Sequence, residues 1–271
     1  MDFGLEGKVA VVAGSSKGAG RGIAVQLARE GCKVAVNGRE AGPLAEAQAE
    51  VIAAARSPQH VVAVSADIKT TEGAEKLIDE ARTRLGPIDI LIINMAEPKW
   101  GRFDEYDTND WDESFLEIKA NVDLVRAAVP DMKASGWGRI ISLGSHCAKE
   151  PHLDVPLIGG NVVRSGLVAL HKTLSWELGP LGITVNTIAV GSIQTGRLDY
   201  WREWMAEREK RTGEQLAHRY AATGRRGNTL GRTGSPEEMG WVVTFLASER
   251  SSFITGACID VSGGATKSLF G

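Results

Sequence analysis

The stretch that decides the fold is Val9–Ala24, which reads VAVVAGSSKGAGRGIA. It begins as a β-branched apolar run, turns through glycines and continues with the spacing of an amphipathic helix. A continuous apolar run is expected of a parallel strand that is covered on both faces. Gly14 permits a sharp turn, Gly18 lets the backbone approach a diphosphate, and Gly20 lets the helix pack close to the strand. Because a helix start offers unpaired N–H groups and positive potential, this stretch predicts a dinucleotide-binding unit rather than a turn that binds nothing.

Similar units continue along the chain. Apolar runs at 33–37, 61–64, 88–93, 139–145, 182–189 and 253–261 predict six further strands, and helical patterns occupy 43–55, 71–85 and 110–132. Strands that alternate with helices in this way are typical of the α/β class. The expected fold is a single-domain, Rossmann-type doubly wound parallel sheet of about seven strands, with helices on both faces.

The composition is that of an ordinary globular protein, with 271 residues of which 43% are hydrophobic and 24% charged. We expect one domain over residues 1–271, because such folds often reach ~250 residues without splitting. A net charge of −3 gives no reason to expect nucleic acid or an anionic membrane as a partner. Three cysteines stand far apart in the sequence and predict neither a metal site nor a disulfide framework. No apolar stretch approaches the ~18 residues that span a bilayer, so the expected location is the cytoplasm.

Two cations near the end of the second strand predict which dinucleotide binds. Arg39 follows that strand, and Lys17 lies in the glycine loop beside the same region. In sheets of this kind an acidic residue here favours a free ribose 2′-hydroxyl, whereas a basic residue accommodates a 2′-phosphate. The position holds Arg39 and no acid. Two cations beside it can make charge-assisted hydrogen bonds to a phosphate, which a free hydroxyl does not offer. NADP(H) is therefore the predicted cofactor; the alternative is two solvated surface charges.

The spacing of Gly14, Gly18 and Gly20 resembles that of the short-chain dehydrogenase/reductase family, and the resemblance extends from about Gly7 to Gly264. It implies a hydride transfer between a nicotinamide and a carbonyl or alcohol substrate, in a homo-oligomer, either a tetramer or a dimer. It also implies cofactor contacts at the adenine, the riboses, the diphosphate and the nicotinamide carboxamide. The predicted cofactor-binding residues are Gly14, Ser15, Ser16, Lys17, Gly18, Gly20, Arg39, Asp67, Ile68, Asn94, Ala96, Arg164, Ile193 and Thr195.

The catalytic motif departs from the family pattern. Ser145 resembles the catalytic serine, which hydrogen-bonds the substrate carbonyl oxygen, and Asn121 resembles the asparagine that anchors a water on a proton relay. The family's Tyr-x-x-x-Lys belongs on the next helix. Counting back from Trp176 puts Gly160 at the tyrosine position and Arg164 at the lysine position. With no tyrosine expected nearby, the usual general acid is missing.

The expected catalytic residues are Asn121, Ser145, Asn161 and Arg164. Arg164 keeps a permanent positive charge and several donors, but with a pKa above ~12 it is no proton donor. Asn161 lies beside the vacant position and orients substrate or water. We predict that an ordered water, held by Ser145, Asn121 and Arg164, supplies the proton.

Three side chains are alternative proton donors. Successive side chains of an extended strand point to opposite faces, so His146 would point away from the cleft if Ser145 points into it. A turn at this place would reverse that. His152 lies in the following loop and titrates near neutrality. Tyr200 reaches the site only if it lies on a lid that closes.

Residues 196–231 are predicted to form a substrate lid. Leu198, Trp201, Trp204 and Met205 recur at helical spacing, a pattern that is more often packing than a cofactor site. Eight Lys or Arg against four Glu between Arg202 and Arg232 suit an anionic substrate or, equally, a solvated helix face.

Two other classes of function stay open. One is a non-redox lyase, dehydratase or isomerase on the same scaffold, and the other is a cofactor-binding protein without catalysis. The motif at Ile193 and Thr195 favours a redox enzyme, because relatives use it to hold the nicotinamide. The missing tyrosine favours the other two.

Overall fold

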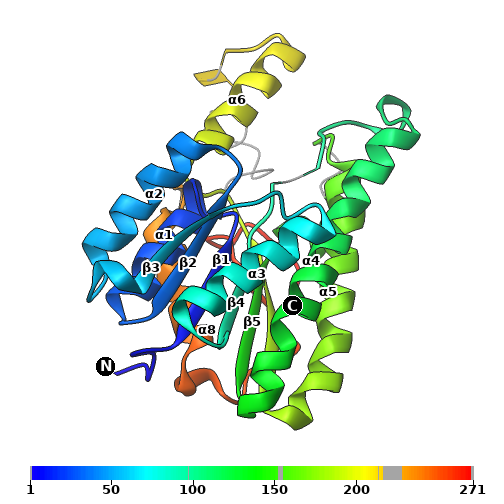
Figure 1. Cartoon of the computed structure of the whole chain (residues 1–271). Helices are drawn as coiled ribbons and strands as arrows, with labels where there is room; N and C mark the ends of the chain where they lie inside the picture. Colours follow the sequence, from blue (N-terminus) through cyan, green and yellow to red (C-terminus); the bar gives the residue numbers. More distant parts are fainter. Residues whose placement is uncertain (1, 97, 152–154, 213, 216–227, 270–271) are drawn as a thin grey trace.

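The protein, a computed structural model, is described over residues 2–96, 98–151, 155–212, 214–215 and 228–269 (Figure 1). Its strands are β1 Val9–Ala13, β2 Lys33–Gly38, β3 Val61–Ser65, β4 Ile90–Ile93, β5 Gly138–Leu143, β6 Ile183–Val190 and β7 Cys258–Val261. Its described α-helices are α1 Gly18–Arg29, α2 Ala41–Ala54, α3 Thr71–Leu85, α4 Thr108–Ser135, α5 Ile158–Leu178, α6 Gly196–Glu209 and α8 Pro236–Ala247. The strands and helices alternate as the sequence pattern predicts.

The seven strands form one parallel sheet in the order β3-β2-β1-β4-β5-β6-β7, which confirms the predicted fold. Alternate residues of β1 enter two separate cores. Val9 and Val11 pack with apolar side chains of α3 and α4 on one face of the sheet. Ala10 and Val12 pack with α1, α2 and α8 on the other face (Figure 1). The strand order reverses between β1 and β4, and a ligand crevice is expected there at the carboxyl ends of the strands.

The last strand is shorter than predicted, because only Cys258–Val261 pairs with β6. Over the preceding residues, side-chain hydrogen bonds join backbone bonds such as the one from Gly256 N to the Val185 carbonyl at 2.7 Å. The Asn186 amide donates to the Ile254 carbonyl at 2.8 Å, and its Oδ1 accepts from the Ala257 backbone N at 3.1 Å. An asparagine that satisfies two backbone groups in this way takes the place of part of the strand pairing.

Helix α6 lies beyond the carboxyl ends of the strands, at the top of Figure 1. Its apolar stripe packs on the loop after β4 and on the segment before α5. The cluster contains Trp100, Val155, Leu157, Trp201 and Met205, with Leu198 and Trp204 partly buried against it. The apolar stripe of α6 therefore serves packing, and the helix lies over one side of the crevice.

Candidate functional site

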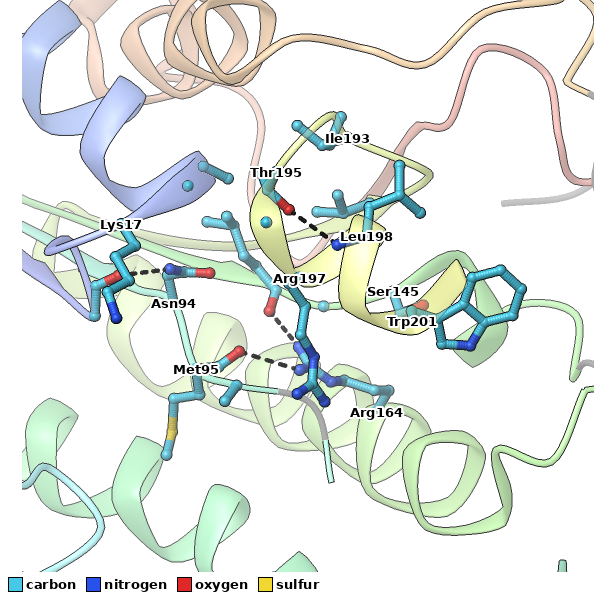
Figure 2. Close-up of a pocket in the computed structure, with 18 of the residues that line it drawn as sticks. Lys17, Asn94, Met95, Ser145, Arg164, Ile193, Thr195, Arg197, Leu198 and Trp201 are labelled. Carbon is cyan, nitrogen blue, oxygen red and sulfur yellow. Dashed lines mark hydrogen bonds between the residues drawn. The ribbon is translucent and has the colours of Figure 1, made fainter. Parts of the chain in front are cut away.

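One cavity of about 780 Å³ lies at the switch point of the sheet (Figure 2). It runs from the β1–α1 loop and the end of β2, past the loops after β4 and β5, to the loop after β6 and the start of α6. All but two of the predicted cofactor-binding residues line it: Gly14, Ser16, Lys17, Gly18, Arg39, Asp67, Ile68, Asn94, Ala96, Arg164, Ile193 and Thr195. Ser15 and Gly20 are not among the lining residues.

The glycine loop is shaped for close approach. Gly14 and Gly18 have φ of +64° and +59°, which L side chains rarely adopt. A Cβ at Gly14 would overlap the Asn94 carbonyl, and one at Gly18 would lie 3.2 Å from Thr195 Cγ2. Gly20 packs against the Gly14 carbonyl, so its role is the predicted helix packing.

The start of α1 is open to an anion. Lys17 is its N-cap residue, and no side chain caps the helix. Ser15 is committed elsewhere: its Oγ donates to the Val12 carbonyl at 2.6 Å and accepts from the Asn37 backbone N at 2.9 Å. The uncapped N–H groups and the glycines beside them fit a dinucleotide diphosphate.

The adenosine end of the cavity holds the predicted Asp67 and a second acid, Glu40, that the prediction did not include. Lys17 pairs with Glu40 at 3.0 Å, and Arg39 pairs with Asp67 at 3.6 Å. Glu40 directly follows Arg39 in the sequence. The prediction did not consider Glu40 because it took Arg39 as the end of the second strand. All four side chains are 42–66% exposed, so both ion pairs are weak and free to rearrange around a phosphate.

Ser145 and His146 both line the catalytic end of the cavity. Strand β5 ends at Leu143, and a 3-10 turn over His146–Ala148 follows, with Ser145 Oγ accepting from the Cys147 backbone N at 3.4 Å. This is the turn that the sequence analysis named as able to reverse the parity, and both side chains line the cavity. His146 Nδ1 lies 2.9 Å from the Val190 carbonyl. Because a carbonyl only accepts, Nδ1 must carry a proton, and in the neutral ring Nε2 then carries none.

Arg164 is buried, with 4% of its surface exposed. Its Nη1 donates to the Leu143 carbonyl at 2.6 Å and its Nη2 to the Met95 carbonyl at 3.4 Å (Figure 2). Nη2 also lies 3.0 Å from Glu117 Oε1, in a pair whose side chains are 5% and 4% exposed. Nε has no hydrogen-bond partner among the described residues. The guanidinium is thus fixed by the protein through Nη1 and Nη2.

Sequence reasoning missed Glu117. It lies one helical turn before Asn121 on α4, next to α5. The available signal was the arginine itself, since a buried guanidinium needs a carboxylate partner.

The other two predicted catalytic residues do not line the cavity. Asn121 is 1% exposed; its Oδ1 accepts from Ser142 Oγ at 3.2 Å, and its Nδ2 donates to the Glu117 carbonyl at 2.8 Å. Asn121 also contacts the Met95 sulfur at 3.8 Å. Asn161 lies in the first turn of α5, and its buried Oδ1 has no hydrogen-bond partner among the described residues. The structure therefore brings Ser145 and Arg164 together in the cavity lining and places neither asparagine there.

One tyrosine does approach the vacant position, against expectation. The Tyr106 ring fills the space that a Cβ on Gly159 would need, and its hydroxyl donates to the Lys99 carbonyl. Burial raises the pKa of Tyr106, so it stays protonated at neutral pH. Neither Tyr106 nor Tyr200, which is 56% exposed, is among the described residues that line the cavity.

His152, the third alternative donor, lies outside the described residues.

Four of the five lid cations that the structure describes are paired at the surface. Ion pairs join Arg202 to Asp199, Arg208 to Glu105, Arg211 to Glu209 and Arg232 to Glu238, at 2.7–3.7 Å. Arg219, Arg225 and Arg226 lie outside the described residues. A different cation, Arg197, lines the cavity, and the sequence analysis missed it because the charge count began at Arg202.

The described part of the chain contains no group of three or more His, Cys, Asp or Glu arranged to hold a metal ion. No helix within the described ranges is long and apolar enough to cross a bilayer. Cys32 is a free, buried thiol whose pKa burial raises to about 12, so it is not a reactive thiolate.

The sheet order, the glycine loop and the cavity at the switch point define a Rossmann-type dinucleotide-binding protein. A family model described as Enoyl-(Acyl carrier protein) reductase matches residues 13–266. The 3-oxoacyl-(acyl-carrier-protein) reductase FabG of Aquifex aeolicus is 32% identical over 97% of this chain and 99% of its own length. The chain belongs to the short-chain dehydrogenase/reductase family.

Two solved structures bear on the site. L-sorbose reductase from Gluconobacter frateurii, complexed with NADPH and L-sorbose, matches with a TM-score of 0.89 and 32% identity, covering 99% of this chain and 100% of that one. A short-chain oxidoreductase from Pseudomonas aeruginosa PAO1 matches with a TM-score of 0.85 and 25% identity, covering 98% and 99%. The latter is described as containing an atypical catalytic center.

Proposed function

We propose that the chain is an NADP(H)-dependent reductase of carbonyl compounds with a non-standard proton donor. The observation that carries the proposal is a single cavity that joins the glycine loop of a dinucleotide site to Ser145 and Thr195. Relatives described as reductases, one of them complexed with NADPH, support it. Lys17 and Arg39 are proposed to bind the 2′-phosphate by exchanging their exposed carboxylate partners for it.

The chain's own residues are proposed to polarise the substrate. When bound, the nicotinamide supplies the hydride for the carbonyl carbon. Ser145 Oγ–H donates to the carbonyl oxygen, and the guanidinium of Arg164, which lines the same cavity, stabilises the developing negative charge. Because Leu143, Met95 and Glu117 already hold Arg164, the donor needs no reorganisation during the reaction.

We propose that an ordered water held by Ser145 and Arg164 supplies the proton. Asn121 does not line the cavity, and its proposed role is to hold Ser142 and Met95 in place. His146 is the competing donor, because it lines the cavity beside Ser145. A positioned acid is typically worth 10²–10⁴ in rate, so substitutions separate the two routes.

We also propose one domain over residues 1–271, with a substrate lid over 196–231, in a homo-oligomer. The lid proposal is supported by α6, whose apolar stripe packs on Trp100 beside the cavity. The oligomer proposal is supported by the large apolar side chains Trp176, Trp241 and Phe253, which are 76%, 58% and 102% exposed. Light scattering coupled to gel filtration measures the oligomeric mass.

The test of function is direct. Purified protein is incubated with NADPH and a panel of aldehydes and ketones, and the loss of NADPH absorbance is followed. We expect turnover with at least one carbonyl, and a ~10²-fold or greater loss in Ser145→Ala. Tight NADPH binding without turnover on any substrate would instead support a protein without redox catalysis.

A further inference from the structure

Asn37, near the end of β2, joins two separate parts of the cavity wall. It lines the cavity and is only 1% exposed. Its Oδ1 accepts from the Gly14 backbone N at 3.1 Å, and its Nδ2 donates to the carbonyls of Val64 and Ala66, both at 3.1 Å. Gly14 belongs to the glycine loop after β1, whereas Val64 and Ala66 lie at the carboxyl end of β3. One buried amide therefore connects the glycine loop to the end of β3.

The backbone of Asn37 holds the same glycine loop. Its carbonyl accepts from the backbone N of Ser15 at 2.9 Å and of Ser16 at 3.0 Å, and its own N–H donates to Ser15 Oγ at 2.9 Å. The next residue, Gly38, packs so closely on the loop that a Cβ there would lie 2.5 Å from Ser16 Cβ. The glycine loop therefore packs directly on the end of β2.

The hydrogen bonds of Asn37 indicate a supporting role rather than direct contact with a ligand. A side-chain amide has two N–H donors, and the carbonyls of Val64 and Ala66 take both. The residues that Asn37 connects are those that face a cofactor: Gly14 begins the loop that fits the diphosphate, and Arg39, two residues further on, lies at the adenosine end.

We infer that Asn37 is a positioning residue for NADP(H), which sets the separation between the diphosphate loop and the adenosine 2′-phosphate end. The inference deepens the proposed function and rests on its cofactor site. A dinucleotide that binds both ends at once gains affinity when the two ends are held at the separation that it spans, as two linked ligands do. A looser junction therefore weakens the whole cofactor more than a fragment that occupies one end.

The test compares NADPH with adenosine 2′-monophosphate, a fragment that has the 2′-phosphate but no diphosphate. Their Kd values are measured by calorimetry for the wild type, Asn37→Ala and a matched control, Asn186→Ala, on samples that circular dichroism shows to be folded. Asn186 is also 1% exposed and also satisfies two backbone groups, but it is not among the described residues that line the cavity. We expect the ratio of the fragment Kd to the NADPH Kd to fall about tenfold or more in Asn37→Ala and to stay within about twofold of wild type in Asn186→Ala.

An unchanged ratio in Asn37→Ala, whether both ligands weaken by the same factor or neither does, would overturn the inference. An equal fall of the ratio in Asn186→Ala would also overturn it, because the effect would then be a general loosening of the fold. If Asn37→Ala does not fold, Asn37→Ser replaces it; we expect a fall of about threefold or more, and an unchanged ratio again overturns the inference.

These binding measurements are independent of carbonyl turnover, so the two proposals can fail separately. If no carbonyl in the panel oxidises NADPH, the reductase is refuted, while a fall of the ratio in Asn37→Ala still supports the role of Asn37. If turnover occurs and the ratio is unchanged, the reductase stands and the role of Asn37 is refuted.

Discussion

Replacing Glu117 by glutamine is expected to destabilise the protein more than any surface charge substitution, because it removes the carboxylate that balances a buried arginine. The pair is separated by 3.0 Å, with its side chains 4% and 5% exposed. Breaking a buried ion pair at one partner costs about 3–5 kcal/mol. Glutamine keeps one acceptor oxygen, and the Leu143 and Met95 carbonyls still hold the guanidinium. We therefore expect the lower end of that range, about 3 kcal/mol.

The assay is equilibrium unfolding in urea without NADPH, because a bound ligand adds its own stabilisation. A matched control is Glu249→Gln. Glu249 also faces a buried arginine, Arg139, but at 3.9 Å and with its own side chain 55% exposed. For that pair we expect at most about 1 kcal/mol.

A double variant keeps the test independent of general damage to the fold. In Glu117→Leu/Arg164→Met both charges are removed together, and apolar replacement of a buried pair is often neutral or stabilising. We expect the double variant to recover most of the stability that Glu117→Gln loses. The reasoning is refuted if Glu117→Gln costs no more than Glu249→Gln, or if the double variant is less stable than Glu117→Gln.

Three further perturbations have defined outcomes. Arg39→Asp should raise the Kd of NADPH at least tenfold while the Kd of NADH stays equal or falls, measured by cofactor fluorescence; equal losses for both cofactors would contradict the 2′-phosphate assignment. Burial lowers the pKa of His171 to about 4, against about 6.5 when unfolded, so between these values the unfolded chain binds the extra proton. The stability present above pH 6.5 should fall by about 3 kcal/mol as the pH drops toward 4, and His171→Asn should flatten this part of a urea-unfolding series; parallel pH profiles would exclude the effect. His146→Gln should keep at least a tenth of turnover, with kcat/KM level across pH 6–8, because water supplies the proton; a thousandfold loss would make His146 the acid.

Most of the fold was predictable because its signals are local. The β-branched run followed by Gly14 and Gly18 predicts a tight turn with a close backbone approach. Both glycines have positive φ, and a Cβ on either would meet a neighbouring residue. Helix α3 begins at Thr71 and ends at Leu85, as its periodicity predicts. The end of the sheet was less predictable, because the Asn186 side chain on β6 satisfies backbone groups of Ile254 and Ala257 and takes the place of part of the pairing that an apolar run implies.

The residues of the candidate site that could be predicted are those that motif spacing along the sequence defines. Counting from a helix end singled out Arg164, which lines the cavity, but its partner Glu117 lies on a neighbouring helix that no spacing rule connects to it. The orientation of His146 depends on where β5 ends, and strand ends are the least legible feature of a sequence. Tyr106 reaches Gly159 from 53 residues away, a contact that exists only because the loop after β4 runs alongside the start of α5.

The departures at Gly160, Arg164 and Glu117 make one electrostatic arrangement. A lysine beside a tyrosine stabilises the phenolate that forms when the tyrosine gives up its proton; with glycine at that position, no such anion forms. A permanent guanidinium buried there without a counter-charge would be costly, and Glu117 removes that cost at 3.0 Å. Because the pair is neutral as a whole, its contribution to a developing alkoxide comes from directed N–H groups rather than from net charge.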